Sequence, residues 1–217
     1  MKIFLDTADV TQIRKLNATG LIDGVTTNPT LIRKSGLHPD HVYAEIAEMG
    51  ITDISMEVSG TVGEMYAEAQ RLHNTFGDVA TIKLPMTSDG LLVCNQISAQ
   101  GIRTNVTLIF SIPQAILAAK AGATYVSPFV GRLDDQQVSG LEVVRGIAGL
   151  YAQKGVKTQV LAASIRTVHR AVRSFYNGAS IVTMPPEVFE GMYNHILTDK
   201  GLEIFEQDLL SLKELFS

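Results

Sequence analysis

Short apolar segments alternate with longer amphipathic segments along the whole chain. The apolar segments are rich in Val, Ile and Leu and end at Pro, Gly, Asn or Asp, which is typical of buried strands. They predict eight strands, at residues 2–5, 24–29, 53–60, 79–85, 102–108, 124–130, 158–163 and 180–184. Between them, apolar residues recur every three or four positions, which predicts helices. These helices are expected at residues 10–16, 41–49, 63–76, 88–99, 113–122, 141–153 and 166–176, with two or three further helical pieces in 187–217.

Alternating strands and helices require a parallel sheet covered by helices. Eight such units in about 200 residues predict an α/β fold, a (β/α)8 TIM barrel in a single domain spanning residues 1–217, with an extra C-terminal helix at about 202–217. The alternative is an open doubly wound sheet, but no Gly-x-Gly-x-x-Gly follows the first strand.

The ends of several elements can be assigned from local chemistry. Asp9 and Ser164 stand where helix N-caps are expected, at the starts of the helices at 10–16 and 166–176. The segment 131–139 is polar and is expected to be a loop.

Composition narrows the class of function. The chain has 217 residues, a net charge of −4 and no long run of like charges, so neither nucleic acid nor a membrane is an expected partner. The single cysteine, Cys94, allows no intrachain disulfide and fits a reducing cytoplasm. The five histidines avoid the strand ends, and His38 and His41 lack a third ligand at useful spacing, so no metal site and no cofactor are expected.

A lysine lies inside one predicted strand, in the run Val79-Ala80-Thr81-Ile82-Lys83-Leu84-Pro85. Burial disfavours the charged ammonium and favours the neutral amine, which is the form that attacks carbonyl groups. Lys83 is therefore a candidate Schiff-base nucleophile. The alternative is a structural lysine that pairs with a carboxylate or extends its amine past the strand end.

Polar side chains recur near the carboxyl ends of seven of the eight predicted strands, where barrels carry their chemistry. They are Asp6, Thr26, Asn28, Glu57, Lys83, Asn105, Thr107, Ser127 and Ser164, whereas the eighth strand ends in Thr183-Met184 and offers little. In a closed barrel these side chains converge, and such a set is hard to explain as packing alone. Their convergence favours the Schiff-base interpretation of Lys83.

These residues resemble one known family over essentially the whole chain. Asp6 and the runs Gly24–Pro29, Ile82–Pro85, Asn105–Phe110, Ser127–Arg132 and Ala163–Arg166 are similar to transaldolase, in the compact subgroup that includes fructose-6-phosphate aldolase. The resemblance implies that a dihydroxyacetone unit is transferred through a Schiff base on Lys83. The donor would be sedoheptulose 7-phosphate or fructose 6-phosphate, and the acceptor erythrose 4-phosphate or glyceraldehyde 3-phosphate, as in the pentose phosphate pathway.

The resemblance also implies a role for each site residue. Asp6 would take the proton of the C4 hydroxyl, and Glu57 would activate a water that shuttles protons, with Thr107 completing that relay. Substrate binding falls to the remaining residues of the set. Asn28, Asn105 and Ser127 would hold the donor, and Arg132, Ser164 and Arg166 would hold its phosphate. Thr107 and Phe129 complete the expected substrate-binding residues.

The aldolases of the subgroup carry Gln at the position of Glu57 and Tyr at that of Phe129, so this chain resembles transaldolase more closely there. The aldolase reaction remains an alternative, as does a non-catalytic sugar-phosphate-binding protein on the same barrel.

After the barrel, Leu202, Phe205, Leu209, Leu212 and Phe216 recur at three and four positions and predict a helix with one wide apolar face. The resemblance implies a homodecamer of two stacked pentamers, in which this helix lies against a neighbouring subunit.

Overall fold

Eight parallel strands close into a barrel in the order β1 to β8 in this computed structural model, which describes residues 1–216. The strands are β1 (Lys2–Asp6), β2 (Gly24–Thr26), β3 (Ile54–Glu57), β4 (Ala80–Pro85), β5 (Thr104–Ile109), β6 (Tyr125–Pro128), β7 (Gln159–Ala162) and β8 (Ile181–Met184). β1 pairs with β8 from Lys2 opposite Ile181 to Leu5 opposite Met184, which closes the sheet. The predicted (β/α)8 barrel is confirmed, and the open sheet is excluded.

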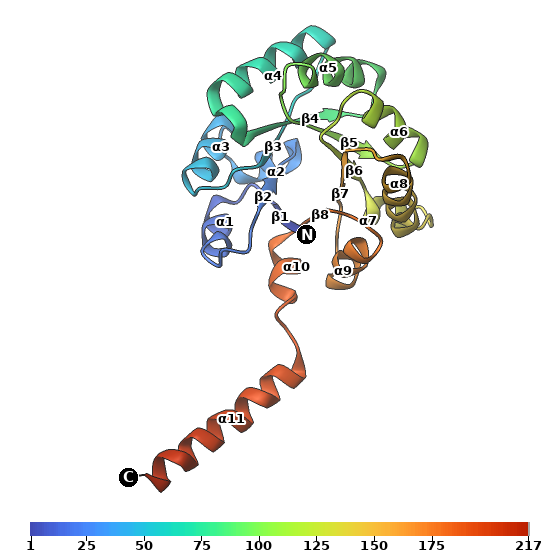
Figure 1. Cartoon of the computed structure of the whole chain (residues 1–217). Helices are drawn as coiled ribbons and strands as arrows, with labels where there is room; N and C mark the ends of the chain where they lie inside the picture. Colours follow the sequence, from blue (N-terminus) through green and yellow to red (C-terminus); the bar gives the residue numbers. More distant parts are fainter. Residues whose placement is uncertain (217) are drawn as a thin grey trace.

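Most of the helices surround the barrel as an outer ring, and the last one projects away from it (Figure 1). They are α1 (Val10–Asn17), α2 (Pro29–Ser35), α3 (Pro39–Glu48), α4 (Val62–Phe76), α5 (Ser88–Ser98), α6 (Ile112–Lys120), α7 (Val130–Asp135), α8 (Gly140–Lys154), α9 (Val168–Tyr176), α10 (Pro186–Gly191) and α11 (Ile196–Leu215). A 3-10 turn, Gly77–Val79, precedes β4. Within residues 1–216, no helix is long and apolar enough to cross a membrane.

Of the predictions for two helix caps and one loop, one is confirmed and two are wrong. Asp9 caps α1, as expected, by accepting from the backbone N–H groups of Thr11 and Gln12. The expected loop at 131–139 is wrong, since a short helix, α7, occupies its first half. Ser164 is not a helix cap, because α9 starts later and Thr167 caps it, which leaves Ser164 free to face the barrel mouth.

The core has two parts, one on each side of the sheet. A large cluster of apolar side chains lies between the strands and the helix ring. A smaller one, made of Phe4, Tyr125, Leu161, Ala163 and Ile181, comes from β1 and the β6–β8 side and fills the barrel interior.

A buried polar group occupies the amino-terminal end of the barrel. Asp53 accepts hydrogen bonds from Thr81 Oγ1 (2.8 Å) and the Tyr125 hydroxyl (2.6 Å), and it pairs with Arg103 at 3.0 Å. With that end filled, the opposite end is the one that remains open to a ligand.

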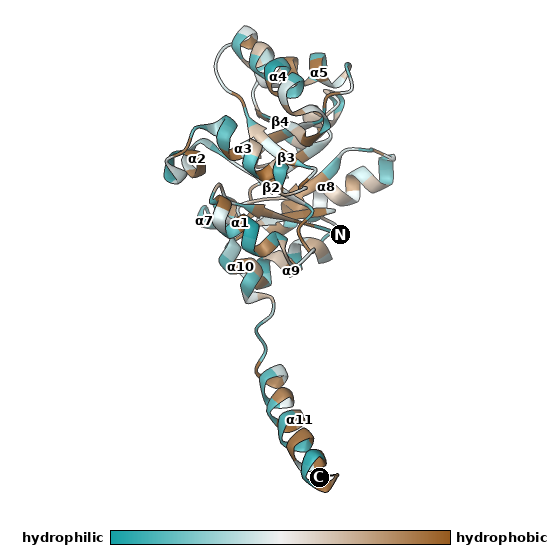
Figure 2. Cartoon of the chain, turned by 90° about the vertical axis from the view of Figure 1, so that its left-hand side faces the viewer, coloured by the Kyte–Doolittle hydropathy of each residue, from teal (hydrophilic) through white to brown (hydrophobic). Residues whose placement is uncertain are grey.

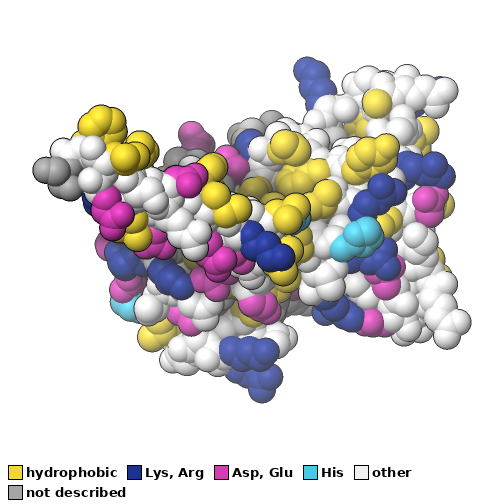
Figure 3. Space-filling model, turned by 90° about the horizontal axis from the view of Figure 1, so that it is seen from below, with side chains coloured by type: hydrophobic (Ala, Val, Ile, Leu, Met, Phe, Trp, Pro, Cys, Tyr) yellow, Lys and Arg dark blue, Asp and Glu magenta, His cyan; other side chains and the backbone are white. Residues whose placement is uncertain are grey.

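The last helix, α11, projects away from the barrel as an isolated arm (Figures 1 and 2). It begins at Ile196, six residues before the expected start at Leu202, and none of its residues is buried. The expected apolar face is present, with Phe205 and Leu209 more than half exposed. Figure 3 views the chain from the side on which this arm projects, where hydrophobic side chains lie exposed among charged ones.

Candidate active site

A cavity opens at the carboxyl ends of the strands. Its lining comes from seven of the eight strands or the residues just after them, which is where barrels of this type place their chemistry. The lining residues are Asp6, Thr26, Asn28, Lys83, Asn105, Thr107, Ser127, Phe129, Arg132, Ala163, Ser164 and Thr183. The structure therefore brings together nine of the eleven predicted site residues, and the remaining two, Glu57 and Arg166, lie beside lining residues.

Lys83 is held by two oxygen atoms. Its Nζ pairs with Glu57 Oε2 at 2.8 Å and donates to the Thr27 backbone carbonyl at 2.9 Å. Only 5% of Lys83 is exposed, and Glu57 lies directly opposite it on β3. The Lys83 amine is thus paired with a carboxylate rather than isolated. A buried pair of this kind adds little net stability, which leaves a functional reason for retaining it.

Asp6 lies at the end of β1 as a second, partly buried carboxyl group. Burial raises its pKa, while the charge of Lys83 and a hydrogen bond from Thr26 act in the opposite direction. Thr26 Oγ1 donates to Asp6 Oδ1 at 2.8 Å and lies 2.6 Å from Thr183 Oγ1. Because Thr26 donates its only hydroxyl proton to Asp6, Thr183 is the donor in the second contact. The two hydroxyl groups form a chain that ends on the carboxyl oxygen.

Thr183 was missed by the sequence analysis, which expected the eighth strand to offer little. That expectation is wrong, because Thr183 lines the cavity and belongs to the chain that reaches Asp6. The alternation of inward-facing and outward-facing side chains along the strands could have revealed Thr183. Thr183 pairs with Phe4, two residues before Asp6, so the three side chains share the inner face of the barrel.

A second hydrogen-bonded group lies on the opposite wall. Ser127 Oγ donates to Asn105 Oδ1 at 2.7 Å, and Asn105 Nδ2 donates to Ser55 Oγ at 3.1 Å. Ser55 is a further residue that sequence reasoning missed. These bonds fix the orientation of the Asn105 amide beside Lys83, its neighbour on β4.

Thr107 has a buried hydroxyl without a partner. It is 1% exposed, and within residues 1–216 its Oγ1 makes no hydrogen bond. A buried hydroxyl usually has a partner, and this one belongs to the cavity lining. It is therefore available to a water or a substrate atom.

Asn28 caps a helix and also lines the cavity. Its Oδ1 accepts from the Leu31 backbone N–H at 3.0 Å and so caps α2. Asn28 also lines the cavity. The capping bond fixes its side-chain oxygen and leaves the amide nitrogen as a donor.

Two arginines lie at the outer edge of the cavity. The guanidinium of Arg132 lies over the Phe129 ring, 4.9 Å from its centroid, and Phe129 packs edge-on against Phe110. Arg166 follows β7 and pairs through both terminal nitrogens with Asp135, each bond being 2.5 Å. Its positive charge holds the pKa of Asp135 below the ordinary value.

Two residues at the site adopt a left-handed backbone although they are not glycine. They are Leu108 (φ 61°), at a bulge in β5, and Ser164 (φ 57°). Such conformations are unfavourable for residues with a side chain and occur often at functional sites. Leu108 follows Thr107, and Ser164 lies next to Arg166 along the cavity edge. Ser164 itself lines the cavity, and Leu108 directly follows the lining residue Thr107.

The barrel and its site define an aldolase-type enzyme. A lysine, two carboxyl groups and two arginines at the mouth of a parallel barrel suit carbonyl chemistry on an anionic sugar.

Comparison with known proteins identifies the family. The family described as Transaldolase/Fructose-6-phosphate aldolase matches residues 3–216, and this chain belongs to it. A "Probable transaldolase" of Caulobacter vibrioides (strain NA1000 / CB15N) is 50% identical over 212 residues, covering 97% of each chain. A "Probable transaldolase" of Ruegeria pomeroyi (strain ATCC 700808 / DSM 15171 / DSS-3) is 49% identical over 210 residues, covering 96% of each.

A solved structure from Coccidioides immitis, provisionally assigned as a fructose-1,6-biphosphate aldolase, aligns with a TM-score of 0.61 at 12% identity. The match covers 85% of this chain and 73% of that one. At this identity the likeness concerns the fold alone.

Proposed function

We propose that this protein is a transaldolase that transfers a dihydroxyacetone unit through a Schiff base on Lys83. The donor is sedoheptulose 7-phosphate or fructose 6-phosphate, and the acceptor is erythrose 4-phosphate or glyceraldehyde 3-phosphate. The observation that carries the proposal is the Lys83 ammonium, buried at the base of the cavity and paired with Glu57 at 2.8 Å. The reaction belongs to the pentose phosphate pathway, and we place the enzyme in the cytoplasm, in keeping with its single free cysteine.

The Lys83–Glu57 pair supplies the nucleophile. Transfer of one proton from Nζ to Glu57 Oε2, along the 2.8 Å contact, gives a neutral amine and a carboxylic acid. The amine adds to the C2 carbonyl of the ketose, and loss of water from the adduct leaves the imine. Glu57, acting through a water that the free Thr107 hydroxyl also holds, gives and takes the protons of these steps.

Asp6 is the base for carbon–carbon cleavage. Its carboxylate takes the proton of the C4 hydroxyl while the C3–C4 bond breaks, and the bonding electrons flow into the protonated imine. An aldose phosphate leaves, and the three-carbon unit stays on Lys83 as an enamine. Addition of the enamine to a second aldose phosphate reverses these steps, with Asp6 returning the proton.

The other lining residues hold the substrates. Asn28 and Asn105 offer amide groups to the donor hydroxyls, and Ser127 contacts the terminal hydroxyl of the donor. Phe129 forms part of the wall and supports Arg132. Arg132, Ser164 and Arg166 bind the phosphate, since arginine recognises phosphate oxygens in pairs.

Two side chains favour transfer over aldol cleavage. Glu57 is an ionisable proton carrier next to Lys83, and Phe129 brings no hydroxyl into the cavity. The fructose-6-phosphate aldolase reaction, in which the enamine is protonated and dihydroxyacetone is released, is the alternative.

An acceptor assay separates the two reactions. With fructose 6-phosphate as donor, we expect erythrose 4-phosphate to increase the release of glyceraldehyde 3-phosphate at least tenfold, because the enamine then has a carbon acceptor. Both products are measured by coupled enzyme assay and by chromatography of free dihydroxyacetone. If the release of glyceraldehyde 3-phosphate does not change when erythrose 4-phosphate is added, and free dihydroxyacetone accumulates, the enzyme is an aldolase.

The pH dependence tests Asp6 as the base. Thr26→Val removes the hydroxyl donor that favours the ionised carboxylate, so the already raised pKa of Asp6 rises further. Activity that needs ionised Asp6 is lost as the pH falls through this pKa. The acid limb of the kcat/KM profile is therefore expected to move to higher pH.

The matched control is Thr81→Val, which removes the same bond from a buried threonine to a buried aspartate, Asp53, at the closed end of the barrel. This variant should leave the acid limb in place. An acid limb that is unchanged by Thr26→Val would contradict the assignment of Asp6.

We further propose that α11 joins copies of this chain into a homo-oligomer, a decamer of two stacked pentamers by resemblance to the compact subgroup. The helix exposes Leu202, Phe205, Leu209 and Leu212 and contacts no part of its own barrel closely enough to bury any of its residues. An apolar face of this length on an isolated arm is typical of a helix that docks on a partner.

Sedimentation velocity tests this assembly. We expect the intact chain, of 23.5 kDa, to sediment near ten times that mass. Phe205→Glu combined with Leu209→Glu is expected to yield smaller species, whereas Gln207→Glu, on the opposite face of α11, should not. A monomeric intact chain would refute the proposal.

A further inference from the structure

We propose that Asp135 is a positioning residue for the substrate phosphate: it holds Arg166 by one edge of the guanidinium and presents the other edge to the anion. This inference rests on the proposed function, since it concerns the phosphate end of the same cavity. It assigns a task to a carboxylate that would otherwise be an unfavourable neighbour for a phosphate.

The geometry of the pair defines which edge is used. Arg166 Nη1 donates to Asp135 Oδ1 and Nη2 donates to Oδ2, so the carboxylate takes the end of the guanidinium. A guanidinium has five N–H groups in one plane, and this arrangement uses two of them. The side edge, formed by Nε–H and the second Nη2 hydrogen, makes no hydrogen bond or ion pair with any residue of the described chain.

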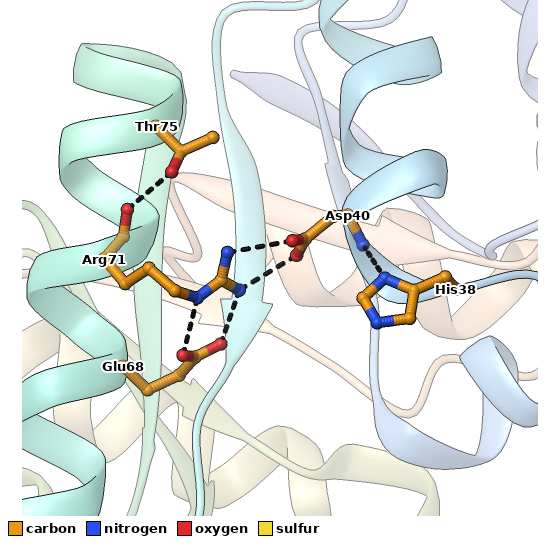
Figure 4. A network of polar contacts seen from close by, with 5 residues as sticks. All are labelled: His38, Asp40, Glu68, Arg71 and Thr75. Carbon is orange, nitrogen blue, oxygen red and sulfur yellow. Dashed lines mark hydrogen bonds and ion pairs between the residues drawn. The ribbon is translucent and has the colours of Figure 1, made fainter.

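The same protein contains an arginine with both edges occupied. Arg71 binds Asp40 through Nη1 and Nη2, as Arg166 binds Asp135, and it binds Glu68 through Nε and Nη2 at 2.8 and 2.7 Å (Figure 4). One guanidinium therefore accommodates two oxyanions at once, one on each edge. At Arg166 the position equivalent to Glu68 is where two phosphate oxygens would bind.

The side edge of Arg166 lies next to the cavity. A side-chain carbon placed on Gly131 would come within 2.9 Å of Arg166 Nε and 3.0 Å of Ser164 Oγ. Both donors therefore lie against the start of α7, where the Ser164 backbone carbonyl, closer still to the same position, also excludes a side chain at 131. Ser164 lines the cavity itself, so an anion bound there meets Ser164 and the Nε edge together.

The other charged groups nearby do not replace Asp135. Asp134 pairs with Arg170 at 3.1 Å and accepts from the Gly140 backbone N–H, so its charge acts on Arg166 without a direct hydrogen bond or ion pair within residues 1–216. Arg132 lies over Phe129 and makes no ion pair with a residue in 1–216. Two arginines thus face the phosphate, and only one of them is held by a carboxylate.

Stability alone gives little reason for the Asp135–Arg166 pair. Both side chains are about half exposed, at 47% and 54%, and pairs at such positions contribute little to folding. An exposed arginine, however, has many rotamers, and fixing one of them before the ligand arrives removes part of the entropy lost on binding. The expected gain is in affinity for the phosphate rather than in folding.

Calorimetric titration with inorganic phosphate tests this role without requiring turnover. We expect Asp135→Ala to raise the Kd of phosphate about fivefold and Asp135→Asn to raise it less, because the amide keeps one acceptor for Arg166. Asp40→Ala removes an equally placed end-on partner from Arg71, away from the cavity, and should leave the Kd unchanged. With fructose 6-phosphate, Asp135→Ala should raise KM by a similar factor and change kcat less than twofold.

Three results would overturn the positioning role of Asp135. If Asp135 acts only through its negative charge, both substitutions will lower the Kd of phosphate, and an unchanged Kd would show an ion pair without a binding role; either result overturns the proposal. Failure of the intact protein to bind phosphate also overturns it. If phosphate binding responds as expected but no transfer reaction is found, the proposed function fails and the anion site stands.

Discussion

The contact between Lys83 Nζ and Glu57 Oε2, at 2.8 Å, is the interaction on which the account of this protein depends. Burying an isolated ammonium is unfavourable by several kcal/mol, and the carboxylate together with the Thr27 carbonyl makes its burial possible. The same contact is a route for one proton, and its transfer leaves a neutral amine. One pair thus explains both how a lysine can stand inside a barrel wall and how it can become a nucleophile.

The barrel topology supplies everything else that this pair needs. The closed order of strands places Glu57, Lys83 and Asn105 on adjacent strands at one level and brings Asp6 from the first strand to the same cavity. The apolar interior cluster and the Asp53 group fill the opposite end, so water and substrate enter from one side. Chemistry is thereby confined to the carboxyl ends, where α7 contributes Arg132 and the segment after β7 contributes Arg166.

Sequence patterns predicted the strands and most of the site because the signals were local. Each strand is a short apolar run, and each predicted residue stands late in such a run or just after it, as Asp6 and Lys83 do. The predictions failed where the determinant was a contact between distant segments. Thr183 matters through Thr26 and Asp6, Ser55 through Asn105, and Asp135 through Arg166, and none of these pairs is visible along one strand. The α7 helix and the left-handed Ser164 were missed as well, and they too are joined by contacts between distant segments, since the backbone N–H groups of Val130 and Gly131 donate to the carbonyls of Ala163 and Ser164.

The most direct test of the account is borohydride reduction in the presence of fructose 6-phosphate, followed by intact mass and peptide mapping. We expect one reduced dihydroxyacetone unit per chain, attached to Lys83. Lys83→Ala should abolish the adduct, whereas the control Lys154→Ala, on the outer helix α8, should retain it. Absence of an adduct from the intact protein, or an adduct that survives Lys83→Ala, would contradict the covalent mechanism.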